Sequence, residues 1–82
     1  MPNRHSLHKI HLEELKTWLL QDLWIIEPAK GEFEVLRARK SGGRRMIILY
    51  DRLESKEHYT IRDKDWPVIA AFLRDRKRQE SL

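Results

Sequence analysis

The residues with the clearest capacity for chemistry are five cations that lie close together. Lys and Arg fill five of the nine positions from 37 to 45, and no Asp or Glu occurs between Val35 and Tyr50. Guanidinium groups bind phosphate well because their forked donors form two parallel hydrogen bonds. The pattern therefore indicates a phosphate-binding surface. Its members are Arg37, Arg39, Lys40, Arg44 and Arg45.

The spacing of these cations predicts that they lie on a β-hairpin. Residues 33–39 alternate between the two sides of a strand, which places Arg37 and Arg39 on the same side. Residues 40–44 contain Gly42-Gly43 and predict a tight turn, because glycine readily adopts positive φ. Residues 45–50 form the returning strand. A two-stranded ribbon fits a nucleic-acid groove, although an edge hairpin kept soluble by charge explains the same residues equally well.

A second basic run, residues 74–78, lies near the C-terminus. Cations are favourable at the end of a helix, where the helix dipole is negative, and this explains the run without any partner. If the run lies beside the hairpin, it adds to the affinity for phosphate. We therefore include three of its residues, Arg76, Lys77 and Arg78, among the candidate nucleic-acid-binding residues.

The overall charge agrees with a polyanionic partner. The net charge is +4, but residues 1–34 hold four Lys/Arg and six Asp/Glu, whereas residues 35–82 hold thirteen and seven. Such asymmetry favours a partner such as DNA or RNA. The alternative is that the charged residues, 37% of the chain, simply keep a small domain soluble.

No pattern of catalytic or metal-binding residues accompanies the cations. His5, His8 and His11 lack a partner at the spacing of a metal site, and we expect no metal and no cofactor. His58 is the only plausible general base near the predicted sheet, and no recognisable nucleophile accompanies it. We therefore expect a protein that is not an enzyme. Trp18, Trp24 and Trp66 lie at positions typical of core residues.

The hydrophobic pattern predicts an α+β fold. A helical stripe is formed by Leu12, Leu15, Leu19 and Leu23, so we expect a helix from about residue 7 to 22. Ser6 would cap this helix, and a loose N-terminal arm precedes it. After the hairpin and a loop at 51–57, residues 58–62 predict a third strand. A last helix is expected next, capped by Asp63 or Asp65 and with Pro67 in its first turn. The buried stripe of this helix is formed by Trp66, Ile69, Ala70 and Leu73, and we expect the helix to fray beyond Arg74.

The resulting order is α-β-β-β-α, with a three-stranded antiparallel sheet between two helices. If residues 24–26 form a full strand, the sheet has four strands. We expect a single domain over residues 1–82, with an ordered core from about 7 to 76 and frayed termini. With no cysteine, no apolar run of roughly 20 residues and no apolar signal-peptide core at the start, the expected location is the cytoplasm.

The order of elements over residues 7–78 resembles that of double-stranded-RNA-binding domains. It is also similar to that of the small HicA-type toxins, which are RNases. The segment that corresponds to the functional motif of double-stranded-RNA-binding domains is Asp63-Lys64-Asp65-Trp66-Pro67, which is net acidic. The segment that corresponds to the motif of the HicA-type toxins is Lys30-Gly31-Glu32-Phe33, which contains no histidine. We therefore carry over no functional residue. Small size and dense charge also resemble bacteriophage accessory proteins.

Two functions follow from these observations. The first is a small non-enzymatic module that binds DNA or RNA through the basic hairpin. The second is a protein-interaction module, such as a regulator or inhibitor of a larger machine, which uses the strand at 46–50 or a sheet edge. Either strand addition by a partner or homodimerisation would bury that edge.

Overall fold

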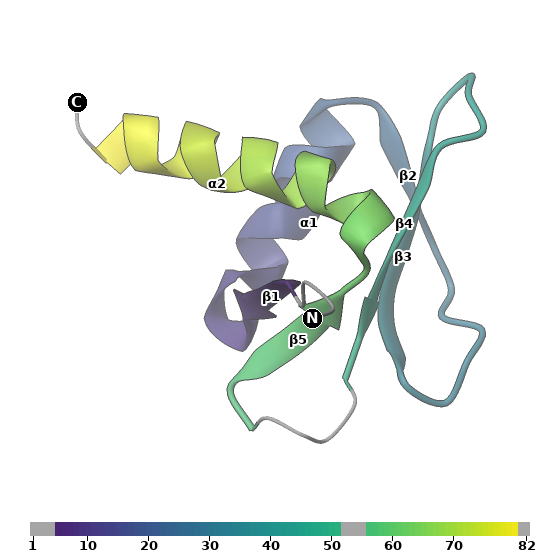
Figure 1. Ribbon diagram of the computed structural model, residues 1–82. Coiled ribbons are helices and arrows are strands. Elements are labelled where there is room, and N and C mark those ends of the chain that lie inside the picture. Colours follow the sequence, from purple (N-terminus) through teal and green to yellow (C-terminus); the bar gives the residue numbers. More distant parts are fainter. Residues whose placement is uncertain (1–4, 52–55, 81–82) are drawn as a thin grey trace.

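The computed structural model describes residues 5–51 and 56–80. Over these residues the chain forms one five-stranded antiparallel sheet and two α-helices (Figure 1), so the predicted α+β class is confirmed. The strands are β1 (His5–His8), β2 (Trp24–Glu27), β3 (Glu34–Lys40), β4 (Met46–Tyr50) and β5 (His58–Ile61). The helices are α1 (Leu12–Gln21) and α2 (Trp66–Glu80), each preceded by a short 3₁₀ helix, η1 (Lys9–His11) and η2 (Asp63–Asp65).

The strand order across the sheet is β1-β5-β4-β3-β2. Strands β2 to β5 are neighbours in sequence order, and β1 joins the far side of β5. The central strand is therefore β4, as its apolar side chains on both faces predict. Ile47 and Leu49 point toward the helices, whereas Ile48 points to the opposite face beside Arg37 and is only 5% exposed.

Both helices cover the same face of the sheet (Figure 1). Leu15 and Leu19 of α1 and Ile69 and Phe72 of α2 are buried in one core. The sheet contributes Leu7, Trp24, Leu36, Ala38, Ile47, Leu49 and Ile61 to that core. The result is two layers, with the described part of the chain placing no helix on the other face.

The number of strands corrects the prediction of three or four. The chain carries two further strands, β1 and β2, so that the described order is β-α-β-β-β-β-α. Strand β2 is the optional strand at residues 24–26, and its register with β3 pairs Trp24 with Lys40. Strand β1 was not predicted. Its four residues contain a single apolar side chain, Leu7, and therefore show no alternation.

The first residues of the described chain are a strand and not the predicted loose arm. Leu7 is buried, and the ring of His5 stacks on Trp66 with centroids 4.4 Å apart, so β1 is held by side chains distant in sequence. His8 and not Ser6 provides the first cap, because its Nδ1 accepts a hydrogen bond from the Ile10 amide at 3.2 Å. Consequently α1 begins at Leu12, several residues later than predicted.

Helix α1 ends at Gln21, one residue before the predicted boundary. The next turn places Leu23 in the left-handed region with φ of 65°, and Leu23 is 70% exposed. It therefore leaves the apolar stripe to which its spacing assigned it. The Leu23 carbonyl accepts a hydrogen bond from the Ser41 amide at 2.9 Å, which ties the end of α1 to the hairpin turn.

Helix α2 is longer than its apolar pattern indicates, because it continues to Glu80. Pro67 lies in its first turn, as predicted. Its most buried side chains are Val68, Ile69 and Phe72, so the buried stripe is rotated from the predicted one. Trp66 and Leu73 of that predicted stripe pack against the core while remaining partly exposed.

Candidate nucleic-acid interface

The tip of the β3–β4 hairpin carries two exposed arginines. The turn is closed by hydrogen bonds from the Lys40 amide to the Arg45 carbonyl and from the Gly43 amide to the Lys40 carbonyl. Gly42 has φ of 76°, a conformation that side chains disfavour. Arg44 and Arg45 follow this turn and are exposed. Within residues 5–51 and 56–80, neither guanidinium has an ion pair.

The predicted cation Arg37 is instead part of a buried ion pair. Its Nη2 lies 2.7 Å from Oε1 of Glu34, and its Nε donates to the same oxygen at 2.8 Å. The two side chains are only 15% and 6% exposed. Nη1 also contacts the sulfur of Met46 at 3.0 Å. Because its charge is balanced by Glu34 and each of its three nitrogens already has a contact, Arg37 is placed to stabilise the sheet.

Arg39 and Lys40 are also balanced by acids from neighbouring elements. Nε of Arg39 lies 3.5 Å from Oε2 of Glu27 on β2. Nζ of Lys40 lies 3.0 Å from Oδ2 of Asp22 and 5.6 Å from the centroid of the Trp24 ring. The hydrogen bond from Lys40 holds the pKa of the Asp22 carboxyl below its ordinary value and outweighs the opposing effect of desolvation. Asp22 is therefore ionised at neutral pH.

The structure thus divides the five predicted hairpin cations into two groups. Arg44 and Arg45 remain without acidic partners in the described chain, whereas Arg37, Arg39 and Lys40 each face a carboxylate. Residues 36–49 contain no acid, but this local feature does not show which acids other parts of the chain bring to the hairpin. Glu27 lies on β2 and Asp22 follows the end of α1, so these acids meet Arg39 and Lys40 only in the folded chain.

The predicted C-terminal cations are also divided. Arg76 donates to Glu14 of α1 at 2.7 Å and lies 2.7 Å from Glu80. The hydrogen bond from Arg76 lowers the pKa of Glu14. Arg78 is exposed and has no ion pair within the described residues. Figure 1 places the end of α2 far from the hairpin tip, so the structure does not bring residues 76–78 beside Arg44 and Arg45.

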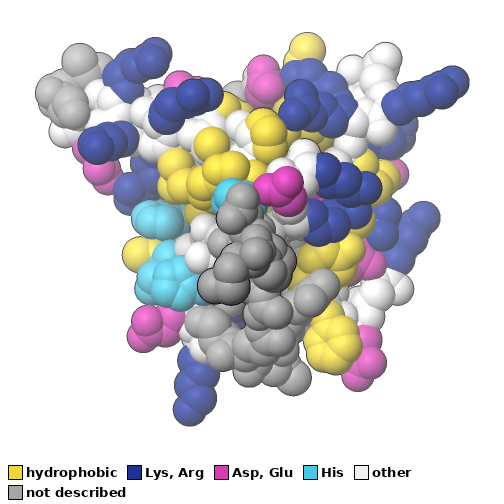
Figure 2. Space-filling model, viewed as in Figure 1, with side chains coloured by type: hydrophobic (Ala, Val, Ile, Leu, Met, Phe, Trp, Pro, Cys, Tyr) yellow, Lys and Arg dark blue, Asp and Glu magenta, His cyan; other side chains and the backbone are white. Residues whose placement is uncertain are grey.

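The start of α2, in contrast, lies beside the hairpin. Pro67 and Ala71 line the same cleft as Arg45. Arg74 and Arg78 continue along this side of the helix, because they follow Ala71 by steps of three and then four residues, which stay on one helical face. Figure 2 shows Lys and Arg side chains along α2 and at the hairpin tip. Arg74, which is not among the predicted cations, belongs to this exposed row.

The cleft beside Arg45 has a volume of about 350 Å³. It lies where the hairpin, the end of α1 and the first turns of α2 meet. Aromatic and aliphatic side chains form most of its wall, and charged groups lie among them. The lining residues are Trp18, Asp22, Trp24, Lys40, Arg45, Pro67, Val68 and Ala71.

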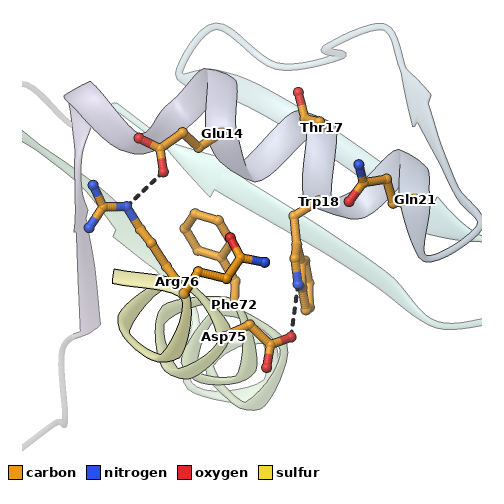
Figure 3. Close-up of a pocket in the computed structure, with 8 residues that line it drawn as sticks. Glu14, Thr17, Trp18, Gln21, Phe72, Asp75 and Arg76 are labelled. Carbon is orange, nitrogen blue, oxygen red and sulfur yellow. Dashed lines mark hydrogen bonds and ion pairs between the residues drawn. The ribbon is translucent and has the colours of Figure 1, made fainter. Parts of the chain in front are cut away.

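A second cleft of about 290 Å³ lies between the two helices (Figure 3). Two interhelical hydrogen bonds cross it, from Trp18 Nε1 to Asp75 at 3.1 Å and from Arg76 to Glu14. The Trp18 ring also meets the Phe72 ring edge-on, with centroids 5.7 Å apart. Trp18 lines both clefts, and these contacts fix its indole between them.

The histidines gather at the β1–β5 edge without forming a metal site. His8 lies opposite His58 in the register, with ring centroids 4.9 Å apart, and His11 is 6.3 Å from His8. Within residues 5–51 and 56–80, no group of three or more His, Asp or Glu has the geometry to hold a metal ion. Neither helix of the described chain is long and apolar enough to cross a membrane.

No family model, curated protein or solved structure matches this chain. The resemblance to double-stranded-RNA-binding domains and HicA-type toxins therefore stays a prediction.

Proposed function

We propose that this protein is a non-enzymatic nucleic-acid-binding module. The observation that carries the proposal is the contrast within the basic hairpin. Its two tip arginines, Arg44 and Arg45, are exposed and lack acidic partners in the described chain, whereas its strand cations are neutralised. A cation held in solvent without a balancing acid is available to phosphate, and arginine binds phosphate through two donors at once.

The phosphate contacts come from the hairpin tip and from the exposed side of α2. Arg74 and Arg78 add two cations without ion pairs in the described chain, in a row that begins beside Arg45. Four such contacts predict a strong dependence on salt, because each neutralised phosphate releases bound counterions. The slope of log K against log salt concentration should be about −3 to −4.

The test is a titration of labelled DNA and RNA oligonucleotides, followed by fluorescence anisotropy at two salt concentrations. Replacing Arg44 and Arg45 together by Ser should weaken binding at low salt by more than tenfold and make the salt slope shallower by about two. A matched control replaces Lys30 and Lys56 by Ser, which removes the same charge. Both lysines are exposed, and they lie in the β2–β3 and β4–β5 connections, at the end of β3 and β4 opposite the hairpin turn.

The two double variants separate local contact from general attraction. If both lose affinity equally, only the net charge matters and the hairpin is not the interface. If the wild-type protein binds no oligonucleotide at low salt, the proposal is wrong.

A protein-interaction module is the second candidate. The observation in its favour is a set of exposed apolar side chains where α1 meets the edge strand β2, namely Leu20, Leu23 and Ile25. Exposed apolar patches mark interaction surfaces on small proteins. Light scattering at micromolar concentration tests for a homodimer. A dimer that becomes a monomer on Ile25→Ser supports this candidate, and a monomer throughout excludes self-association.

A further inference from the structure

The cleft beside Arg45 contains two tryptophan side chains that are held in place. Nε1 of Trp18 donates to Asp75 at 3.1 Å, and its ring packs edge-on against Phe72 (Figure 3). Nε1 of Trp24 donates to Asp22 at 3.3 Å, but Trp24 is only 5% exposed and belongs to the core. The partly exposed Trp18 is therefore the indole that a ligand can reach, and it is positioned before any ligand arrives. Aromatic rings at a cationic surface are the groups on which unpaired bases stack in proteins that bind single strands.

The charges around the cleft are arranged unevenly. Lys40 and Asp22 form an ion pair at 3.0 Å, so their charges cancel. Arg45 also lines the cleft, is exposed, has no ion pair in the described chain, and follows Arg44 at the hairpin tip. An anionic group is thus attracted by the arginines but gains nothing from the balanced Lys40–Asp22 pair. A neutral planar ring suits the cleft, and its attached phosphate suits Arg44 and Arg45.

We propose that this cleft receives one unpaired base of a single-stranded nucleic acid while the adjoining phosphates contact Arg44 and Arg45. The inference rests on the proposed function and names its substrate class. A base within a duplex is stacked between its neighbours and cannot enter the cleft, so the substrate is a single strand or an unpaired segment.

The size and the charge of the cleft together select this occupant. Ligand pockets in proteins span roughly 300–1,000 Å³, and this cleft of about 350 Å³ lies at the lower limit. It accommodates a single flat ring system and not a helix. An apolar side chain from a partner protein would also fit by size, but it would leave Arg44 and Arg45 unused. A nucleotide would place its base in the cleft and its phosphate against Arg44 and Arg45.

The test compares two labelled 12-nucleotide strands at low salt, an oligothymidylate and a strand of equal length that consists of abasic sites. Both carry the same phosphates, so any difference reports on the bases. The wild-type protein should bind the oligothymidylate about 5- to 160-fold more tightly, the range expected from the roughly 1–3 kcal/mol of one stacked base. Equal affinity for the two strands overturns the inference and leaves the proposed function standing. Absence of binding to both overturns the proposed function itself.

Two neighbouring alanines of α2 provide a matched pair of variants. Ala71 lines the cleft, whereas Ala70 does not. Ala71→Phe should reduce affinity for oligothymidylate to that of the abasic strand and leave binding of the abasic strand unchanged. Ala70→Phe should leave both affinities unchanged. If folded Ala71→Phe, verified by circular dichroism, binds oligothymidylate as the wild type does, the inference is wrong. If Ala71→Phe does not fold, the comparison of strands on the wild-type protein decides.

Discussion

The carboxylate of Asp65 accepts a hydrogen bond from the backbone amide of Ile48 at 3.2 Å. Asp65 is 2% exposed and precedes α2 directly, whereas Ile48 lies in the central strand. Nε of Arg62 donates to the same carboxylate oxygen at 2.7 Å. One buried acid therefore joins the start of the last helix, the end of β5 and the strand at the centre of the sheet.

Replacing Asp65 should weaken the fold substantially. Asp65→Ala leaves the Ile48 amide without its acceptor and the Arg62 guanidinium without its counter-charge. Unsatisfied buried groups cost about 1–3 kcal/mol each, so we expect a loss of about 3 kcal/mol in the free energy of unfolding. Urea denaturation measures it. Asp63→Ala is the control, because the Asp63 side chain is 80% exposed and its hydrogen bond with His5 should contribute about 1 kcal/mol or less. Equal losses for the two variants would contradict this role of Asp65.

Arg37 should affect stability without affecting nucleic-acid binding. Arg37→Gln breaks a largely buried ion pair with Glu34, and we expect a loss of about 3 kcal/mol in unfolding free energy. Arg39→Gln should cost about 1 kcal/mol or less, because Arg39 is more exposed and lies 3.5 Å from Glu27. Urea denaturation gives both values. Folded Arg37→Gln should bind oligonucleotides as the wild type does. If folded Arg37→Gln binds oligonucleotides much more weakly than the wild type does, Arg37 belongs to the interface.

The left-handed residue at the end of α1 should be improved by glycine. Residues with a Cβ pay about 1–2 kcal/mol in this conformation, and Leu23 has φ of 65° with an exposed side chain. Leu23→Gly should therefore raise the free energy of unfolding by about 0.5–1 kcal/mol, after the entropy of glycine in the unfolded chain is deducted. Leu20→Gly, within the helix, should lower it by about 1 kcal/mol. Thermal and urea denaturation check both signs.

Acid should destabilise the protein through Asp22 and Glu14. Hydrogen bonds from Lys40 and Arg76 hold the pKa of each carboxyl below its ordinary value, 3.8 for Asp22 and 4.5 for Glu14. A carboxylate with a lowered folded-state pKa contributes stability that is complete above its unfolded pKa. That contribution is lost as the pH falls through the folded value. We therefore expect the unfolding free energy to decline as the pH drops below about 4.5.

Variants identify the groups responsible for this decline. The double variant Asp22→Asn/Glu14→Gln should be less stable at neutral pH and should lose less stability on acidification. Glu32→Gln removes an exposed acid that has no ion pair within the described residues, and it should retain the wild-type profile. Denaturation at several pH values gives the comparison. An unchanged slope in the double variant would assign the acid sensitivity to other carboxylates.

Local patterns predicted the elements whose signals are contained in a few neighbouring residues. The Gly42-Gly43 turn, the alternation along β3 and the leucine stripe of α1 each specify their own geometry. Strand β1 carries no such signal. It exists because Leu7 enters a core built by later residues and because His5 stacks on Trp66.

The candidate interface was harder to predict for the same reason. Whether an arginine is available depends on the acids around it, and those acids come from other elements. Glu27 neutralises Arg39 across the β2–β3 pair, and Asp22 reaches Lys40 from the end of α1. The cleft between Trp18 and Trp24 also forms only when α2 packs across the sheet. Core positions for these tryptophans were predictable, but the shared cleft was not.

The position of β1 also constrains how the chain assembles. Strands β2, β3, β4 and β5 pair in sequence order, so each can add to its predecessor through a short loop. Strand β1 pairs only with β5, through contacts such as His5 with Ile61, which come from opposite halves of the chain. Closing so long a loop is slow. Strand β1 is the first of the five described strands along the chain, yet it is among the last to pair, because its partner β5 is the last of them.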